Sequence, residues 1–168
     1  MKKKKARYYE FEQMLCRSRR ILYKVCLTFT DRKPENVEDL YQEIVENLWR
    51  GWPKFRDESN PMSWVYRVAL NTAGMELRNR KKRYRHQFIP IDEKILTTLT
   101  EEIDPLREQL YFLIDQLDAD EKKLIILYLD GFSHAQIAAI AGSSEAAIKQ
   151  RFMRIKQKLI KYQQDYVE

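Results

Sequence analysis

Two glycine-containing turns within residues 118–162 constrain the fold of this chain more than any other feature. In the first turn, Gly131 can adopt the left-handed conformation that ends a helix, and Ser133 can cap the next helix with Gln136 at the capping-box position. Gly142 and the two serines after it repeat this pattern. The turns enclose a helix of about two turns, with small alanines that permit a close neighbour. A short helix, a tight turn and a longer cationic helix predict a helix-turn-helix, whose second helix enters the DNA major groove.

The longer helix, from Ser144 to about Lys161, has an apolar side and a basic side. The apolar residues recur at helical spacing and predict the buried face: Ile148, Phe152, Ile155 and Leu159. The same stretch contains one acid, Glu145, and six basic residues: Lys149, Arg151, Arg154, Lys156, Lys158 and Lys161. An ordinary solvated helix would also explain a basic face. The preceding turns favour DNA, with residues near the amino end of the helix meeting base edges.

The composition favours an all-α protein with a polyanionic partner. The chain has 168 residues, a net charge of +6 and a pI near 9.2. Only 4 glycines and 5 prolines occur, and few segments alternate like strands. Two cysteines form no disulfide framework, and two histidines are too few for a metal site of recognisable spacing. No apolar run of signal-peptide or membrane-spanning length follows the cationic amino terminus. We therefore expect a cytoplasmic protein with no membrane insertion, metal or cofactor.

The segment from Glu35 to Trp49 combines the clearest apolar periodicity in the chain with an acidic opposite face. Its acids include Asp39, Glu43 and Glu46, and no basic residue lies among them. Acidic residues on the exterior of a helix can simply be solvated. They can also dock a basic protein partner, because complementary charge sets the rate and specificity of association. Both interpretations fit this segment.

A helix that starts near Met62 is predicted to lead into a strongly basic segment. In residues 78–86, six of nine residues are Lys or Arg. Such a segment is either a solvated helix end or a surface that follows DNA phosphates. The nearby aromatic residues Trp64, Tyr66 and Tyr84 favour nucleic acid, because unpaired bases stack on such rings.

An acidic segment separates these helices from the helix-turn-helix. It is bracketed by Pro90 and Pro105 and contains one basic residue, Lys94. We therefore predict two small helical modules, 1–86 and 106–168, joined by a flexible linker, 87–105. A helix at the start of the second module is predicted from a series of apolar residues: Leu106, Leu110, Leu113, Ile114 and Leu117.

Motifs in both modules, from about Tyr8 to Tyr162, resemble the extracytoplasmic-function group of the sigma-70 family of bacterial RNA polymerase sigma factors. The run Asp39-Leu40-Tyr41-Gln42-Glu43 is similar to the polymerase-binding D-x-x-Q-E of that family. The run Trp64-Val65-Tyr66-Arg67-Val68-Ala69, with Asn71, resembles its promoter-melting region. The run Ile148-Lys149-Gln150-Arg151, with Arg154, is similar to its helix-turn-helix. The motifs occur in the order of the family.

The resemblance implies the specificity subunit of a polymerase and not an enzyme. Such a subunit directs promoter-specific DNA binding, strand opening and transcription initiation by core RNA polymerase. The resemblance assigns core binding and the minus-ten element to module 1–86, and the minus-thirty-five element to module 106–168. The polymerase contacts would be the clamp helices of the largest subunit and the flap, with the linker running through the polymerase interior. An anti-sigma factor is a further expected partner.

The resemblance also implies three sets of site residues. Core polymerase would be contacted by Asp39, Gln42, Glu43 and Glu46. Minus-ten DNA, partly single-stranded, would be contacted by Phe55, Arg56, Asn60, Trp64, Arg67, Asn71 and Arg78. Duplex minus-thirty-five DNA would be contacted by Ser144, Glu145, Ala147, Lys149, Gln150, Arg151, Arg154 and Lys158.

Two functions of other classes use part of these features. A repressor or activator that is not a polymerase subunit would also use the helix-turn-helix, but it does not need the basic, aromatic edge of the first module. A DNA-processing enzyme would use Asp39, Glu43 and Glu46 as metal ligands. These three carboxylates lie on one continuous predicted helix with no histidine nearby.

Overall fold

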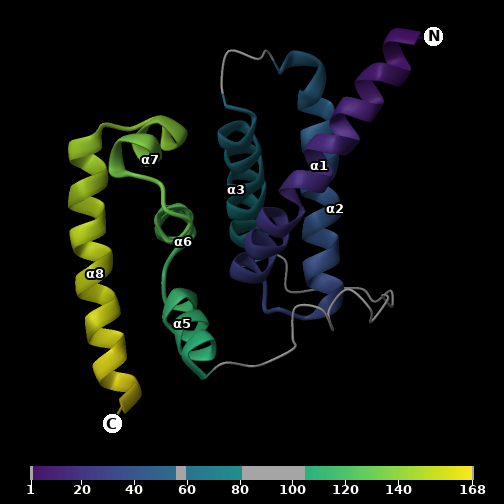
Figure 1. Cartoon of the computed structure of the whole chain (residues 1–168). Coiled ribbons are helices and arrows are strands. Elements are labelled where there is room, and N and C mark those ends of the chain that lie inside the picture. The colour runs from purple at the N-terminus through teal and green to yellow at the C-terminus, as the bar shows by residue number, and fades with distance from the viewer. Residues whose placement is uncertain (1, 56–59, 81–104, 168) are drawn as a thin grey trace. The chain divides into compact units, whose positions relative to one another are not determined.

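The computed structural model describes residues 2–55, 60–80 and 105–167, and every element in these ranges is a helix (Figure 1). The chain divides into two compact units, Met1–His86 and Gln87–Glu168. The predicted all-α fold with two helical modules is confirmed. The predicted linker, 87–105, lies outside the described residues except for Pro105, which begins a helix.

The first unit is a bundle of three mutually contacting helices, α1 (Lys2–Phe29), α2 (Pro34–Gly51) and α3 (Pro61–Arg80). The short 3-10 helix η1 (Trp52–Lys54) follows α2. The apolar series predicted for α2 is buried at Val37, Leu40, Ile44 and Leu48. The same core contains Leu22, Val25 and Phe29 from α1, and Val65 and Ala69 from α3. This core leaves the opposite face of α2 to solvent.

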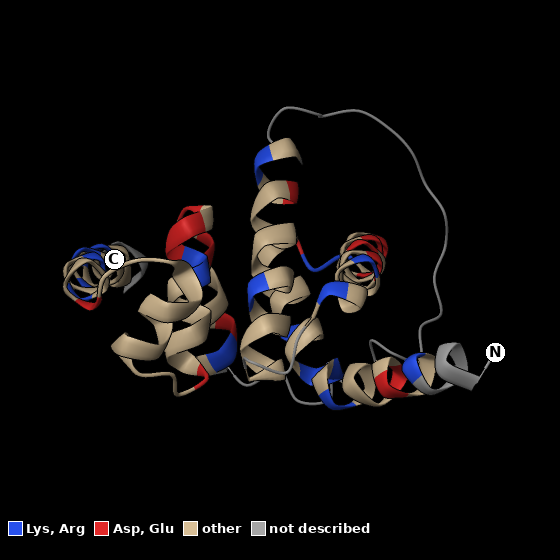
Figure 2. Ribbon diagram, turned by 90° about the horizontal axis from the view of Figure 1, so that it is seen from above, with Lys and Arg blue, Asp and Glu red and all other residues tan. Residues whose placement is uncertain are grey.

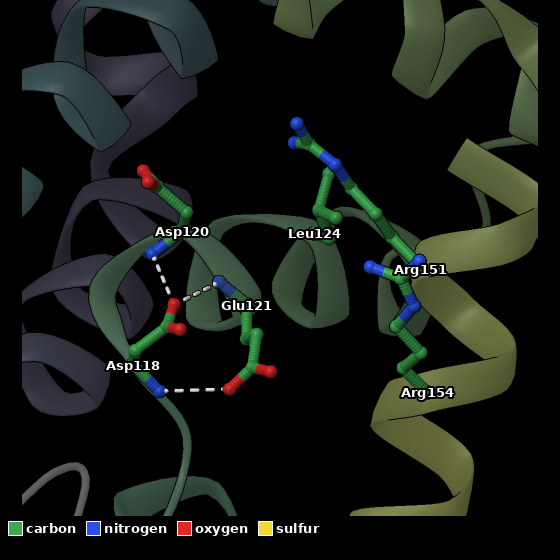
Figure 3. Close-up of a pocket in the computed structure, with 6 residues that line it drawn as sticks. All are labelled: Asp118, Asp120, Glu121, Leu124, Arg151 and Arg154. Atoms are coloured by element: carbon green, nitrogen blue, oxygen red, sulfur yellow. Dashed lines mark hydrogen bonds between the residues drawn. The ribbon is translucent and has the colours of Figure 1, made fainter. Parts of the chain in front are cut away.

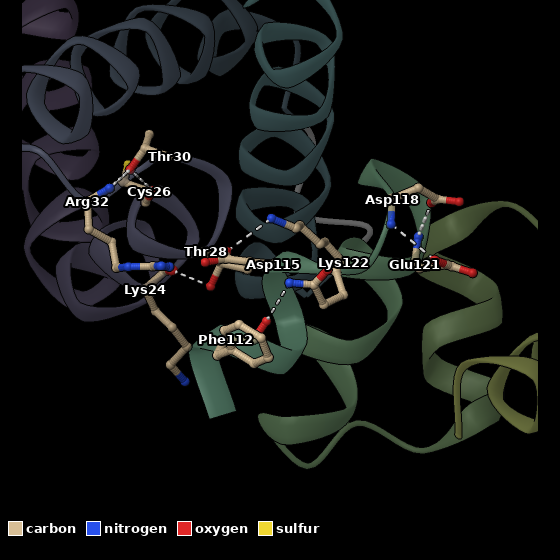
Figure 4. Close-up of polar contacts among 11 residues, drawn as sticks. Lys24, Cys26, Thr28, Thr30, Arg32, Phe112, Asp115, Asp118, Glu121 and Lys122 are labelled. Atoms are coloured by element: carbon tan, nitrogen blue, oxygen red, sulfur yellow. Dashed lines mark hydrogen bonds and ion pairs between the residues drawn. The ribbon is translucent and has the colours of Figure 1, made fainter. Parts of the chain in front are cut away.

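The connection between α1 and α2 turns at Arg32, whose φ of 63° is uncommon for a residue other than glycine. The Thr30 hydroxyl donates to the Cys26 carbonyl at 2.8 Å and accepts from the Arg32 amide at 3.2 Å (Figure 4). Pro34 then occupies the first turn of α2, where the proline ring suits the helix and its missing N–H is not needed. Helix α1 therefore ends before this turn, and α2 begins after it.

The second unit contains α5 (Pro105–Asp115), α6 (Ala119–Leu129), α7 (His134–Ala141) and α8 (Glu145–Val167), and α8 contacts the other three. Its core includes Leu117, Leu124, Leu127, Ile137, Ile148 and Ile155. The apolar series predicted for α5 is only partly internal, because Leu106 and Leu110 are 72% and 40% exposed while Ile114 is buried. The buried Lys122 of α6 lies 3.4 Å from the Asp115 carboxylate, which ties α6 to the end of α5 (Figure 4).

Both turns of the predicted helix-turn-helix have the expected geometry. Gly131 and Gly142 have φ values of 85° and 64°. The Ser133 hydroxyl accepts from the Gln136 amide at 3.3 Å, and the Gln136 side chain accepts from the Ser133 amide at 2.9 Å. At the second turn the Ser144 hydroxyl accepts from the amide of Ala147 at 3.2 Å, which caps the first turn of α8. The helix-turn-helix prediction is confirmed.

Candidate functional site

The four residues expected to contact polymerase are all exposed on α2. Asp39, Gln42 and Glu43 are exposed, and Glu46 pairs with Arg50 at 3.3 Å while its side chain remains 66% exposed. Figure 2 looks along the axis of α2 and shows Asp and Glu gathered on one side of it. Because the apolar residues of α2 are buried on the other side, the carboxylates form an exposed acidic face on a helix that is anchored in the core.

Five of the seven residues predicted to contact minus-ten DNA form one stripe along α3 and the residue just before it. Asn60, Trp64, Arg67, Asn71 and Arg78 follow one another at intervals of four, three, four and seven residues. With about 3.6 residues per turn, these intervals keep all five on the same side of the helix. Asn60, Arg67, Asn71 and Arg78 are exposed and Trp64 is half-buried. The stripe therefore offers two guanidinium groups, two amides and one indole ring along a single face.

An aromatic cluster supports the amino end of this stripe. The Trp64 ring lies 4.9 Å from the Phe55 ring and 6.0 Å from the Trp52 ring, and Phe55 stacks on Trp52 at 5.5 Å. Gly51 permits this packing, because a Cβ at that position would lie 3.0 Å from the Trp64 ring. The cluster thus fixes Trp64 through its neighbours and brings the predicted contact Phe55 beside it. Arg56, also predicted, lies outside the described residues.

Asn60 has a structural role that its place in the stripe did not reveal. Its side-chain oxygen accepts from the Met62 amide at 2.9 Å, and its carbonyl accepts from the Trp64 amide at 3.2 Å. These are the bonds of a residue that caps the amino end of a helix. Asn60 therefore sets the start of α3, and with it the position of the whole stripe.

The residues predicted for minus-thirty-five DNA lie at the amino-terminal part of α8 and along one flank of it. All are exposed except Ala147, which is half-buried. Gln150 shares the outward side with Ala146 and Met153, opposite the buried Ile148 and Ile155. The structure therefore offers an outward side for base edges, with charged groups on the flanks.

Glu145 and Lys149 form an ion pair on one flank of α8. The Lys149 ammonium donates to the Glu145 carboxylate at 2.7 Å, one helical turn apart. The hydrogen bond from Lys149, and then its charge, lowers the pKa of the Glu145 carboxyl. Both side chains are about half-exposed, at 57% for Lys149 and 48% for Glu145. The pair is therefore open to exchange with a phosphate or base edge.

The other flank of α8 faces the acidic first turn of α6 across an open groove of about 200 Å³. Arg151 and Arg154 line one wall of this groove, and the acids of α6 line the other: Asp118, Asp120 and Glu121. Figure 3 shows both arginine side chains extending from α8 toward α6. Lys158, one turn further along the same flank, donates to the Glu121 carboxylate at 2.6 Å. This hydrogen bond raises the pKa of the Lys158 ammonium.

Glu121 is a residue that the sequence analysis did not select. One of its oxygens accepts from the Asp118 amide at 3.0 Å, and Asp118 accepts in return from the Glu121 amide at 2.8 Å (Figure 3). Its other oxygen is the one that holds Lys158. Asp118 followed three residues later by Glu121 is a capping-box pattern visible in the sequence. The contact with Lys158, which is 37 residues away, leaves no such pattern.

In the described ranges, no group of three or more His, Cys, Asp or Glu side chains is placed to hold a metal ion. Among the helices of residues 2–55, 60–80 and 105–167, none is long and apolar enough to cross a membrane.

Comparisons with family models place one known region on each unit. A model described as Sigma-70 region 2 matches residues 15–83, which include α2 and the α3 stripe. A model described as Sigma-70, region 4 matches residues 107–159, which include the helix-turn-helix.

Individual relatives match most of the chain. The ECF RNA polymerase sigma factor SigM of Mycobacterium tuberculosis H37Rv is 24% identical over 153 residues, covering 90% of this chain and 76% of the relative. The ECF RNA polymerase sigma-E factor of Escherichia coli K12 is 28% identical over 140 residues, covering 73% and 71%.

Solved structures with a similar fold include two proteins in complexes. The sigma factor RpoE, bound to the anti-sigma factor NepR from Bartonella quintana, has a TM-score of 0.66 and 23% identity, covering 89% of this chain and 94% of that chain. CnrH, bound to the cytosolic domain of CnrY, has a TM-score of 0.66 and 20% identity, covering 92% and 88%. At these identities the match establishes likeness of fold.

Proposed function

This chain belongs to the extracytoplasmic-function group of the sigma-70 family of bacterial RNA polymerase sigma factors, and we propose that its two units make separate, successive contacts with promoter DNA. It is a transcription initiation factor that binds core RNA polymerase and promoter DNA and directs promoter-specific initiation. The observation that carries this conclusion is the match of region 2 and region 4, in that order, to the two helical units.

The acidic face of α2 is the proposed docking site for core polymerase. Asp39, Gln42, Glu43 and Glu46 would meet the basic clamp helices of the largest subunit, while the second unit contacts the flap. Exposed carboxylates on a rigid helix support this role, because complementary charge speeds association and disfavours wrong partners. The buried side of α2 anchors this face in the core of the unit.

The stripe on α3 is the proposed site for the minus-ten element. Arg67 and Arg78 would track phosphates, while Asn71 and Asn60 would offer amide groups to bases. Phe55 and Trp64 would stack on bases extruded from the duplex, and Arg56 would act from the adjacent loop. Flipping a base costs a few kcal/mol, which aromatic stacking of about 1–3 kcal/mol per base can offset.

The amino-terminal part of α8 is the proposed site for the minus-thirty-five element. Gln150, with its neighbours on the outward side, would meet base edges in the major groove, and Ser144, Glu145 and Ala147 would lie at the entering end. Lys149, Arg151, Arg154 and Lys158 would supply phosphate or base contacts from the flanks. The exposed amino end of α8 and the cations on both of its flanks support this assignment.

Three further properties belong to the same proposal. The chain carries out no chemistry of its own, because strand opening is driven by binding and the polymerase supplies catalysis. It acts in the cytoplasm, where its polymerase partner works. An anti-sigma factor is a fitting regulator, since the similarly folded sigma factor RpoE was solved in complex with the anti-sigma factor NepR.

Reconstitution with core RNA polymerase tests this function. We expect the purified full chain to co-purify with core enzyme and to create transcription starts that core enzyme alone does not make. Mapping transcript 5′ ends with and without the protein would identify its promoters. If the protein does not bind core enzyme, or leaves the start sites unchanged, it is not acting as a sigma factor, and a repressor or activator becomes the better explanation.

The docking face has its own test, D39R together with E43R. Replacing both exposed carboxylates by arginine should abolish co-purification with core enzyme and leave the helical circular dichroism spectrum unchanged, because neither side chain is in the core. The matched control is E10R together with E12R, which makes the same charge change at exposed positions of α1. Equal loss of binding in both variants would show that net charge, and not the α2 face, is responsible.

A further inference from the structure

One cation on the basic flank of α8 is already paired within the chain in the absence of DNA. Lys158 donates to Glu121 at 2.6 Å, and their side chains are 45% and 17% exposed. Arg151 and Arg154 border the same groove as the three acids of α6. The acidic turn thus lies beside the cations that α8 would use to hold phosphate.

Helix capping explains only part of this acidic turn. Asp118 accepts from the amides of Asp120 and Glu121 at 2.9 Å and 2.8 Å, so its carboxylate is required as the cap. One oxygen of Glu121 completes the capping box. The second oxygen of Glu121 serves Lys158 and is not needed for the cap. The Asp120 carboxylate pairs with the Lys123 ammonium at 3.4 Å.

The position of these acids separates two kinds of DNA contact. Arg151, Arg154 and Lys158 recur at three and four residues and share the flank that faces α6. Ala146, Gln150 and Met153 recur at the same intervals on the outward side, away from α6. A carboxylate on α6 therefore acts on the flank that would meet phosphates and leaves the outward side unobstructed.

We propose that Glu121, within the acidic first turn of α6, competes with DNA phosphate for Lys158, so that the second unit binds DNA of any sequence less tightly than its basic residues alone would allow. The inference rests on the proposed DNA-binding role of α8. A phosphate that approaches Lys158 must displace a carboxylate already bonded to it. Sequence-independent affinity comes almost entirely from such phosphate contacts, whereas base contacts on the outward side are unaffected.

Glu121→Gln separates competition from capping. The amide oxygen of glutamine can still accept from the Asp118 amide, because Gln serves in capping boxes as Glu does. The substitution removes the negative charge that holds Lys158. Glu108→Gln is the matched control, since it makes the same charge change at an exposed position of α5 that does not line the groove. Equal melting temperatures of the variants and the wild type would establish that the fold is kept.

The test measures the affinity of the full chain for a short DNA duplex of random sequence. Binding is monitored by fluorescence anisotropy at a series of salt concentrations. We expect E121Q to bind roughly two- to fivefold more tightly than wild type at low salt, the range of an exposed ion pair. The slope of log affinity against log salt should steepen by about 0.9, as expected for one additional phosphate contact. E108Q should change neither quantity beyond the small effect of net charge.

Lys158→Gln, alone and combined with Glu121→Gln, completes a double-mutant cycle. In the wild-type background we expect K158Q to weaken random-sequence binding less than it does in the E121Q background, because Lys158 is already engaged by Glu121. In the E121Q background it should abolish the gain. The proposal is overturned if E121Q behaves like E108Q, if K158Q alone flattens the salt slope of wild type by about 0.9, or if no variant binds random duplex. These experiments contain neither polymerase nor promoter, so their failure is distinguishable from failure to support transcription.

Discussion

Replacing Asn60 by alanine should destabilise the first unit by about 1 kcal/mol, the usual cost of losing a side-chain cap. The substitution removes the 2.9 Å hydrogen bond that the Met62 amide donates to the Asn60 side chain. The amide lies at an exposed helix end, so water can partly replace the lost acceptor. For a domain of 60–100 residues, about 1 kcal/mol corresponds to a fall in melting temperature of about 4–8 °C. Serine and aspartate are also good caps, so N60S and N60D should melt close to wild type.

Tryptophan fluorescence reports this unfolding selectively, because all 3 tryptophans of the chain, Trp49, Trp52 and Trp64, lie in the first unit. The cap argument is refuted if N60A melts like wild type, or if N60S melts as low as N60A. Promoter opening by the holoenzyme then separates the two roles of Asn60. N60S should open the promoter less well than wild type despite a restored melting temperature, because it lacks the amide. Normal opening by N60S would remove Asn60 from the proposed DNA interface.

Three other substitutions test the packing that supports the two interfaces. Ile148→Ala should cost about 2–5 kcal/mol, since the side chain is fully buried; helical circular dichroism should be lost at lower temperature while the tryptophan transition stays in place. Gly51→Ala should destabilise the first unit by about 1–3 kcal/mol through overpacking against Trp64, 3.0 Å from the added Cβ, and should shift the tryptophan emission; an unchanged spectrum and melting temperature would contradict this packing. Burial raises the pKa of the Cys26 thiol from 9.0 to about 12. The first unit should therefore lose stability as pH rises from 9.0 toward about 12, because the unfolded chain releases this proton first. Cys26→Ala should reduce that slope, and an unchanged slope would show that the thiol is not its source.

Local features of the fold were predictable because they depend on neighbouring residues. Gly131 and Gly142 take the left-handed conformation, and Ser133 forms a capping box with Gln136. The apolar series of α2 and α8 face their cores as expected, because the spacing of apolar residues along the chain predicts the buried face of a helix. The series of α5 was misleading at Leu106 and Leu110, because periodicity shows which side of a helix is apolar and not how much of its length is covered.

Residues of the candidate interfaces were selected from motif positions, and the structure adds how some of them are held. The stripe on α3 follows from spacing alone, but its anchoring does not. Trp64 is fixed by the rings of Trp52 in η1 and of Phe55, which follows η1. The side chain of Asn60 caps the amino end of α3. Whether a side chain predicted to meet DNA is already bonded elsewhere depends on neighbours that the motif does not contain.

The sequence by itself determined an all-helical chain, a helix-turn-helix, an acidic helix and the family to which they belong, because turn chemistry, periodicity and charge order act over a few residues. Only the tertiary structure decided which cations of α8 are already engaged. Lys158 meets Glu121 across 37 residues of sequence, and Arg151 and Arg154 share a groove with the acids of α6. Such pairings depend on how α6 and α8 pack, since an ion pair requires a short distance in space and imposes no spacing along the chain.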